Sequence, residues 1–533
     1  MKRASSTIWM GILSGSLLAG AAPAVAGGLY IPGNGPISTM RAGASVASAS
    51  GADAVAANPA GMTKVRGTVV SVGSNLIDYE LTFKRRGVYD DAPAGADPLP
   101  WAGATYAGVE DASTPRIGLG EFQAIPLIAV SSDLGGAVRG LRVGAGLVLP
   151  NAYPSREFGA DYVLDESAGP PPPTRYDIVE QEAAVLLPSV AVAYRVNEKL
   201  DLGARFSFGN AHLKARVYLW GLPENYQEWT GHDAEFTVDT KDNFVPAFSA
   251  GALYRPLEDL ELGVHWTSPA TAKTKGTGVS KTSEFVTIGG APATIGPLAD
   301  GDVNCAPGGT IEALSACVEL QLPMTATVGG RYILRGGDGE ERGDIELNVA
   351  YENWGADRAS DYLVVVDGGL LNSDGEAVLE LKETYLRHGL RDVWSVRLGG
   401  GYSFAVGPGA LLVRGGAAYD TAAAREGWER VDLDGAARFT VAGGVGYRMR
   451  RWQVDLGVGG VIEGAREVGT DCNPTTANKG CDGSGVDQPI DERTGPDPIV
   501  PTAVLTAQDE SPFNAGRYSS HYLLFMLGVS TWF

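Results

Sequence analysis

Apolar and polar residues alternate along much of the chain in segments of about ten residues. In one such segment, Trp452, Val454 and Leu456 alternate with Gln453 and Asp455. Successive side chains of a β-strand point to opposite faces, so a period of two predicts a strand with one apolar and one polar face. Fourteen such segments occur, beginning near Arg66, Glu121, Arg139, Gln181, Glu198, Glu235, Glu258, Val318, Arg342, Leu390, Gly409, Ala436, Arg451 and Tyr518.

The connections between these segments alternate in length. Short turns are expected at 133–138, 196–199, 255–259, 334–343, 406–408 and 448–451. Longer polar loops are expected at 84–120, 150–180, 209–234, 269–317, 355–389, 420–435 and 463–517. An even strand number, with short turns at one end and long loops at the other, is typical of bacterial outer-membrane barrels. The sequence therefore predicts an all-β fold, a 14-stranded antiparallel transmembrane β-barrel, closed because no sheet edge can face hydrocarbon.

The two ends of the chain carry targeting patterns. Lys2 and Arg3 precede an apolar stretch at 8–22, and Ala24-Val25-Ala26 resembles the cleavage site of a secretory signal peptide. We therefore expect a signal peptide at 1–26, a plug at 27–65 and an outer-membrane barrel at 66–533. The final strand resembles the terminal strand that the barrel-assembly machinery recognises, with the outward row Leu523, Phe525, Leu527, Val529, Thr531 and Phe533.

Charge and cysteine content narrow the partners. The net charge of −21 argues against nucleic acid as a partner. The acidic loops could meet lipopolysaccharide through divalent cations, or they could form an ordinary solvated surface. Four cysteines form two local pairs, Cys305 with Cys317 and Cys472 with Cys481, and two disulfides are the natural expectation in an oxidising compartment. Neither pair has zinc-site spacing or a nearby histidine, so no metal site is expected.

The segment before the first strand is a candidate plug. A barrel of fourteen strands encloses a lumen that wall side chains cannot fill, because about eight strands is the filled limit. Residues 27–65 are small and polar and lead to Asn58-Pro59-Ala60. Here the chain resembles the FadL family of long-chain fatty-acid transporters, whose N-terminal hatch carries Asn-Pro-Ala just before the first strand. Further stretches resemble family motifs in the same order, at 187–200, 264–269, 322–332, 351–354 and 415–420.

The resemblance implies passive transport of a hydrophobic small molecule, without a cofactor, by a monomeric barrel in the outer-membrane lipid. It leaves open whether the ligand is a fatty acid or an aromatic or aliphatic hydrocarbon. The chief alternative is a general diffusion porin or a surface adhesin, although a porin needs no plug. An outer-membrane lipase or protease is a lesser alternative, since the five histidines form no catalytic pattern and no phosphate-binding glycine motif occurs. We therefore expect no enzymatic activity.

Two proline-containing stretches are candidates for moving parts. In Asn58-Pro59-Ala60, proline fixes φ and would shape the turn that leads into the wall. The turn could shift to admit ligand or could simply anchor the plug. Pro150 and Pro154 cannot donate to a strand ladder. By resemblance, their stretch is the family's kinked third strand, where a gap in the wall lets ligand leave sideways, although Pro150 could also simply end the strand. The candidate gap residues are Leu149, Pro150, Asn151, Tyr153 and Pro154.

Charged and aromatic residues supply the remaining candidates. An arginine in the lumen could bind a fatty-acid carboxylate, or it could pair with acidic residues across the strands. The lumen candidates are Arg205, Arg397, Arg414 and Arg448, with Asp201, Glu261, His265, Glu346, Glu352 and Asp455. An aromatic loop could capture hydrophobic ligand, as the family's outer groove does, or could pack as a lid. Its residues are Tyr218, Leu219, Trp220, Leu222, Tyr226 and Trp229.

Overall fold

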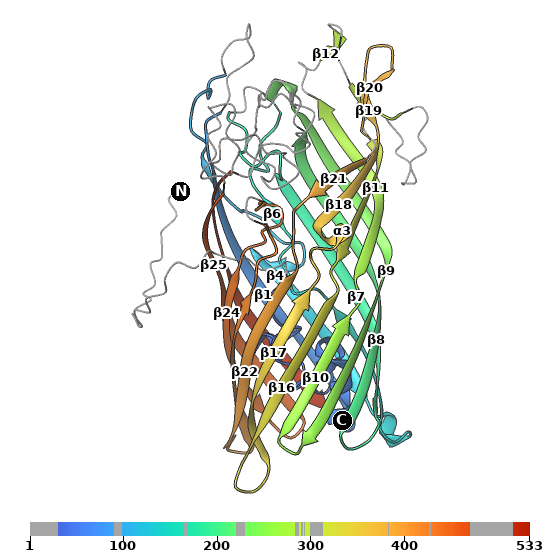
Figure 1. Cartoon of the computed structure of the whole chain (residues 1–533), viewed down its shortest axis with the longest axis vertical. Helices are drawn as coiled ribbons and strands as arrows, with labels where there is room; N and C mark the ends of the chain where they lie inside the picture. The colour runs from blue at the N-terminus through green and yellow to red at the C-terminus, as the bar shows by residue number, and fades with distance from the viewer. Residues whose placement is uncertain are drawn as a thin grey trace.

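A computed structural model describes residues 30–89, 99–164, 169–219, 230–282, 287–288, 291–292, 294–298, 313–381, 383–425, 428–468 and 515–533. It forms a closed antiparallel barrel of fourteen strands (Figure 1). In ring order the strands are β1 (Thr68–Arg85), β4 (Phe122–Ser132), β5 (Leu141–Val148), β7 (Glu180–Arg195), β8 (Leu200–Leu219), β9 (Ala234–Leu257), β10 (Leu260–Thr267), β16 (Thr325–Arg335), β17 (Glu341–Glu352), β22 (Val393–Val406), β23 (Gly409–Asp420), β24 (Arg438–Arg448), β25 (Trp452–Val468) and β26 (Gly516–Trp532).

The barrel closes where its first and last strands pair. β1 and β26 run antiparallel in unbroken register from Val69 opposite Trp532 to Arg85 opposite Gly516. The apolar row of β26 faces outward, as predicted, while the residues between are buried; Phe525 is 41 % exposed and Leu524 is fully buried. This pairing leaves no free edge between the chain ends, as a lipid-facing sheet requires. The predicted fourteen-stranded fold is therefore confirmed.

The polarity of the wall reverses between its two ends. Near the short turns, outward residues are apolar and inward residues polar, as with Leu202 and Asp201 on β8. Beyond the register shift at Gly209 on β8, the inward side chains become apolar, as at Leu213, and the outward ones polar, as at Lys214. The loop predicted at 209–234 was therefore too long, because its first part continues the strand with the opposite polarity.

The wall also extends beyond the ring of fourteen. The segment predicted to begin near Val318 is two strands, because Pro323 interrupts the ladder between β15 and β16. Four strands continue the sheet above β10, β16 and β17 and occupy parts of the loops predicted at 269–317 and 355–389: β11 (Ala270–Thr282), β15 (Ala313–Leu322), β18 (Asp361–Asp367) and β21 (Glu383–Arg387). The remaining short strands are β2 (Gly108–Glu110), β3 (Gly118–Leu119), β6 (Arg156–Glu157), β12 (Thr287–Ile288), β13 (Ala291–Pro292), β14 (Thr294–Gly296), β19 (Gly369–Leu371) and β20 (Ala377–Glu380).

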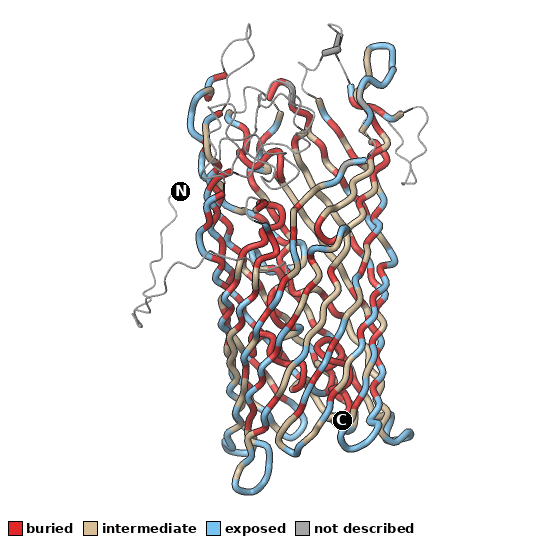
Figure 2. Tube along the Cα trace, in the orientation of Figure 1, coloured by how far each residue is buried: buried red, intermediate tan, exposed pale blue. Residues whose placement is uncertain are grey.

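The N-terminal segment lies inside the barrel. Residues 30–65 fold into short helices and turns that are almost entirely buried against the inner wall (Figure 2). The blue coil in the lower half of the barrel in Figure 1 is this segment. We call residues 30–65 the hatch segment. Its helices are α1 (Pro36–Met40), α2 (Ala54–Ala57) and the 3-10 helix η1 (Pro59–Lys64). Elsewhere in the described ranges lie the short helices η2 (Leu134–Gly136), η5 (Thr230–His232) and α3 (Asp357–Ser360).

Some predictions lie outside the described residues. The signal peptide at 1–26 is one of them. The others are Cys305, Cys472 and Cys481, whose disulfides stay a prediction, and Trp220, Leu222, Tyr226 and Trp229 of the aromatic loop. Cys317 is on β15. Among the helices that the structure does describe, none has the length and apolar character needed to cross a membrane.

Candidate functional site

Asn58, the first residue of the predicted Asn-Pro-Ala motif, links the hatch segment to the wall. Its side-chain amide donates to the carbonyl of Val46 at 2.8 Å and to that of Val264 on β10 at 3.3 Å. Its side-chain carbonyl accepts from Ala60 N at 3.2 Å and caps η1, which has Pro59 in its first turn. The motif therefore anchors the turn to both the hatch segment and the barrel. Of the two roles considered for it, an anchor and a moving part, these contacts describe the anchor.

Two glycines of the wall make this contact possible. A Cβ placed on Gly251 would lie 2.0 Å from Asn58 Oδ1, and one on Gly203 would lie 2.3 Å from Ala60 N. Both distances are far below any real van der Waals contact. The wall of β8 and β9 is therefore bare of side chains where the Asn-Pro-Ala turn rests against it.

Replacing Gly251 with valine tests this contact. The variant Gly251→Val should displace the Asn-Pro-Ala turn, because overpacking of a close contact costs about 1–3 kcal/mol. We expect the displaced turn to let ions pass through the barrel lumen, so that conductance in planar lipid bilayers rises above that of the parent protein. Ala250→Val, which adds the same bulk to the exposed outer face of β9, serves as the control. Equal conductance of both variants and the parent would show that the turn does not depend on this contact.

Ion pairs hold the hatch segment on its other side. Arg41 binds Asp344 of β17 through two hydrogen bonds of 2.9 and 2.8 Å, and Lys64 pairs with Glu261 of β10 at 2.7 Å. Glu346 accepts from the backbone amides of Ala47 and Ser48 at 2.7 and 3.0 Å. Because these groups are buried, removing one partner would leave an uncompensated charge. These polar contacts add to an apolar one, in which Val55 and Met62 of the hatch segment pack on wall residues such as Leu127.

The strand pairing is interrupted next to β5, where the resemblance to the FadL family implied a gap and Pro150 could also simply end the strand. β5 ends at Val148, and its pairing with β4 covers only residues 128–132 of β4. On its other side, β5 pairs with residues 187–194 of β7. In the described chain, residues 125–127 of β4 and 182–186 of β7 therefore have no ladder partner on the sides that face each other, whereas Ala124 N still donates to the carbonyl of Ile117 at 2.7 Å.

The predicted gap residues leave the wall and turn into the lumen. Leu149, Asn151 and Tyr153 are all buried. Asn151 Nδ2 donates to the carbonyl of Ile31 at 3.1 Å, and Ile31 N donates to the carbonyl of Asn151 at 2.7 Å. Pro150 lies between Leu149 and Asn151, and Pro154 follows Tyr153; neither position is in a strand, so a missing backbone donor costs no ladder bond. The kink is therefore bonded directly to the start of the hatch segment, a contact that the sequence did not predict.

A cavity of about 120 Å³ lies at this interruption, and we call it the gap cavity. Its inner lining is apolar and includes Ile125, Val185 and Leu320. Glu182 and Ala184 also line it, and the alternation of β7 directs these two toward the outer face, in line with exposed Val190. The gap cavity therefore touches both faces of the wall.

The interruption in the strand pairing is in register with the apolar outer band. Ala124 on β4 is in register with Leu76 of β1, which in turn is opposite the exposed Phe525 of β26. A polar cluster borders the gap cavity on the long-loop side. In it Arg116 contacts His212 at 2.8 Å and Glu182 at 3.8 Å. The lining of the gap cavity is thus apolar toward the barrel middle and polar toward the loops.

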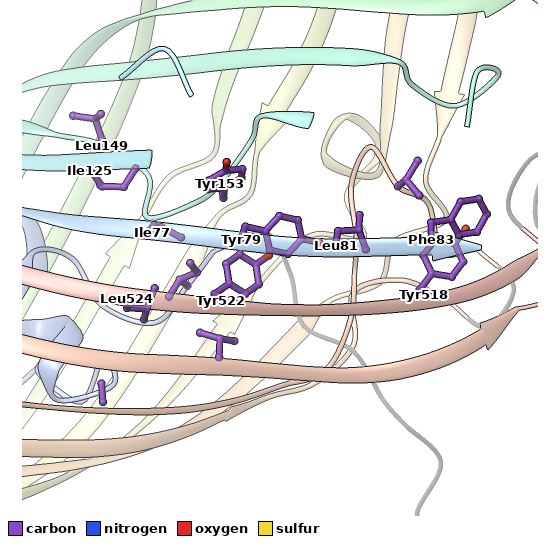
Figure 3. Packing of buried hydrophobic residues seen from close by; sticks show 14 of the residues in the cluster. Ile77, Tyr79, Leu81, Phe83, Ile125, Leu149, Tyr153, Tyr518, Tyr522 and Leu524 are labelled. Carbon is purple, nitrogen blue, oxygen red and sulfur yellow. The ribbon is translucent and has the colours of Figure 1, made fainter. Parts of the chain in front are cut away.

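Apolar side chains line the lumen beyond the gap cavity. Tyr79, Phe83, Tyr518 and Tyr522 of β1 and β26 point inward and pack together, and Tyr153 from the kink packs on Tyr79 with ring centroids 5.5 Å apart (Figure 3). Ile77, Ile125 and Leu149 continue the same cluster to the edge of the gap cavity (Figure 3). A packed cluster of buried apolar and aromatic side chains therefore extends along β1 and β26 to the edge of the gap cavity, with the guanidinium of Arg156 over the ring of Tyr79.

The predicted lumen arginines have different partners. Arg414 pairs with Asp455 at 2.6 Å, Arg397 lies 3.5 Å from Glu352, and Arg448 stacks on the ring of Trp532 at the short-turn end. Arg205 instead donates only to neutral acceptors of the described chain. Of the acidic candidates, Asp201 forms ion pairs with Arg195 and Arg255, which lie at the short-turn ends of β7 and β9.

Two of the predicted capture residues lie in a strand and not in the expected exposed loop. Tyr218 and Leu219 end strand β8, and Tyr218 is buried against Tyr162 with ring centroids 5.6 Å apart. Their predicted placement in a loop was wrong. In this part of β8 the polar side chains face outward and the apolar ones inward, so the segment did not show the alternation expected of a membrane-spanning strand. A role of the aromatic stretch in ligand capture stays a prediction.

The loops of the long-loop end are clamped by a buried ion cluster. Arg430 pairs with Asp177 at 2.8 Å and with Asp432 at 3.2 Å, and His388 Nε2 lies 2.9 Å from Asp432. Burial raises the pKa of Asp177 to about 6, against the opposing effect of Arg430. Burial acts in the same direction on Asp432, but Arg430 and His388 hold the pKa of that carboxyl well below its usual range. The clamp fixes Asp432 and Leu433 over the gap cavity.

Two further cavities flank the hatch segment. One of about 140 Å³ lies between it and the kink; Arg205, His265, Leu149 and Pro150 line it, and we call it the hatch cavity. The other, of about 620 Å³, lies at the short-turn end and is lined by charged groups such as Arg41 and Arg414; we call it the short-turn cavity. Among the described residues, no three histidine, cysteine or acidic side chains are grouped to hold a metal ion.

Comparison with known proteins agrees with this architecture. The family described as "Outer membrane protein transport protein (OMPP1/FadL/TodX)" matches residues 158–476. A Pseudomonas aeruginosa FadL homologue is similar in structure, with a TM-score of 0.65 and 15% identity over 95% of this chain and 99% of that one. The Ralstonia pickettii toluene transporter TbuX and the P. putida toluene transporter TodX each have a TM-score of 0.57 and 14% identity, over 94% of this chain and 99% of theirs.

No curated protein sequence matches the chain significantly. The solved structures share little sequence identity with the chain, so they support its fold alone. The family match covers more than half of the chain and therefore shows its family. That family comprises transport proteins rather than enzymes, which agrees with the prediction on catalysis. The chain thus belongs to the OMPP1/FadL/TodX family of bacterial outer-membrane transport proteins.

Proposed function

We propose that this barrel carries hydrophobic small molecules passively across the outer membrane and releases them sideways through the interruption beside β5. The observation that carries the proposal is the gap cavity, which is lined from both faces of the wall at the level of the apolar outer band. The hatch segment blocks the direct path to the short-turn end, the periplasmic side in this family. Ile125 and Leu149 of the apolar cluster line the gap cavity, so an apolar ligand there contacts apolar side chains.

A sideways exit matches the energetics of an apolar ligand. Moving a methylene group from an apolar surface into water costs about 0.8 kcal/mol, so a chain of about ten methylenes would lose about 8 kcal/mol by entering the periplasm. Passing from the gap cavity into lipid avoids this cost. No energy source is needed, because the ligand moves between apolar environments.

The ligand class is long-chain fatty acids or aromatic and aliphatic hydrocarbons. Similarity to a FadL homologue and to toluene transporters supports this class and leaves its members open. A general diffusion porin is less consistent with the buried hatch segment, which occupies the lumen that a porin keeps open.

Uptake tests the function. Gram-negative cells without their own fatty-acid channel would express the chain and receive labelled oleate or labelled toluene. We expect uptake of at least one compound to rise above that of cells with an empty vector. No rise with either compound, in cells where the inserted barrel is detected by its resistance to unfolding in cold detergent, would overturn the proposal and favour a porin or adhesin.

Pro150 tests the sideways exit. The variant Pro150→Ala restores a backbone donor where β5 stops, so the ladder can extend toward residues 125–127 of β4 and narrow the interruption. We expect lower uptake of the transported compound at an unchanged level of inserted barrel. Pro246→Ala, on the exposed face of β9, is the matched control. Uptake of Pro150→Ala equal to that of the parent would contradict a role of the interruption.

A further inference from the structure

Two lysines lie directly opposite each other on the outer face of the barrel, beyond the apolar band. Lys241 on β9 is in register with Lys275 on β11, and both side chains are exposed. The preceding residues, Thr240 and Thr274, are buried and bonded to each other at 2.8 Å, so the alternation of the strands directs both lysines outward. Directly opposed residues have Cβ atoms about 5 Å apart, and like charges there destabilise the strand pair.

No carboxylate of the described chain forms an ion pair with either of these two lysines, although the net charge of the chain is −21. Other lysines of the same outer face do have such partners. Their ion pairs, at 2.8, 3.5 and 3.8 Å, are Lys214 with Glu180, Lys273 with Glu319 and Lys281 with Glu235. Lys241 and Lys275 are therefore a local double positive charge that the chain itself leaves without a counterion.

Neighbouring groups and strand position do not account for the pair. Of the aspartates nearest to Lys241 on β9, Asp239 lies 2.9 Å from His212 Nε2, and Asp242 accepts from two backbone amides at 2.9 and 2.8 Å. Lysines often protect the free edge of a sheet. Here, however, β9 lies between β8 and β11, and β11 lies between β9 and β15, so neither lysine is on an edge.

The pair lies at the depth of lipid head groups. Phe244 and Phe248 of β9 are exposed on the outer face, and aromatic residues of this kind mark the membrane interface. Lys241 is three positions from Phe244 toward the long-loop end, no more than about 10 Å along the strand. Basic residues at this depth attract anionic head groups. In the outer leaflet of a bacterial outer membrane, the phosphates at this depth belong to the lipid A part of lipopolysaccharide.

We propose that Lys241 and Lys275 bind a phosphate of lipid A and so hold a lipopolysaccharide molecule against β9 and β11. A phosphate between the two ammonium groups replaces their repulsion by two attractions, and lysine binds phosphate as a point charge. The acyl chains would then contact Phe244 and Phe248. This contact is direct, unlike the bridging of acidic loops by divalent cations that the sequence suggested. It lies outside the lumen and does not depend on the transport function.

Lipid binding to the purified full-length barrel tests the proposal. Native mass spectrometry in detergent with EDTA would count bound molecules of diphosphorylated lipid A and of its dephosphorylated form. The parent should prefer the diphosphorylated form. Lys241→Gln combined with Lys275→Gln should weaken its binding at least about tenfold, as expected for loss of bonds to a charged group. Lys214→Gln combined with Lys281→Gln removes the same charge from the same face and should bind like the parent.

Inorganic phosphate separates a lipid site from a site for the free anion. An excess of phosphate should leave diphosphorylated lipid A bound to the parent, because the acyl chains add apolar contacts that the free anion lacks. Displacement by phosphate would assign the two lysines to a free anion and overturn the proposal. Equal binding of diphosphorylated lipid A by the parent and the Lys241 and Lys275 double variant would also overturn it, as would binding that EDTA abolishes.

Discussion

Removal of residues 27–57 is expected to turn the closed barrel into an open, unselective pore. The hatch segment fills a lumen that the wall side chains of fourteen strands cannot fill. The deletion removes Arg41, Ala47 and Ser48, and with them the contacts to Asp344 and Glu346. Single-channel conductance in planar bilayers should rise by about an order of magnitude, because the pore then has the width of an unplugged barrel.

The deletion needs a control for folding. Shortening the exposed turn at 336–340 removes residues of the short-turn end without touching the hatch segment. That variant should keep the low conductance of the parent, and both variants should keep the resistance to unfolding in cold detergent that inserted barrels have. A deletion variant that inserts normally and stays closed would mean that something other than residues 27–57 blocks the lumen.

Filling the gap cavity is expected to abolish transport. Ala183 on β7 points into the gap cavity opposite Ile125, and tryptophan at this position would occupy its apolar part. Because the interruption is the proposed exit into lipid, uptake by Ala183→Trp should fall to that of cells with an empty vector. The measurement is uptake of the compound that the parent transports, at matched levels of inserted barrel.

Ala204 supplies a matched control for this substitution. It lies on the exposed outer face of β8, so Ala204→Trp adds the same indole group to the lipid-facing surface and leaves the lumen unchanged. Its uptake should equal that of the parent. If Ala183→Trp also retained full uptake, ligand would have to leave by another path, and the short-turn cavity would become the first alternative.

The strands of the membrane band could be predicted from the sequence because each carries its own alternation. The segments expected near Arg342, Gly409 and Arg451 begin within about two residues of β17, β23 and β25, a shift within the ordinary uncertainty of strand ends. The end of β5 at Val148, just before Pro150, was also predictable, since proline lacks the donor that the ladder needs. These are local properties of a few residues.

The contacts inside the barrel could not be predicted in the same way. Arg41 binds Asp344, which lies 303 positions later, and Asn151 binds the backbone of Ile31, 120 positions earlier. Which arginine of the lumen lacks a counterion depends on such distant pairings, so Arg205 was one of four equal candidates in the sequence. Tyr218 was misplaced because the wall reverses its polarity beyond the membrane band.

The most direct test of the sideways route is to map where a transported ligand contacts the wall. Outer-membrane vesicles containing the full chain would be illuminated with a hexadecanoic acid that carries a diazirine near the end of its tail, and the labelled peptides would be identified by mass spectrometry. The lateral route predicts labels on residues 122–127 of β4 and 182–186 of β7, which border the gap cavity. Labels confined to the short-turn cavity, around Arg414 and Tyr402, would contradict it.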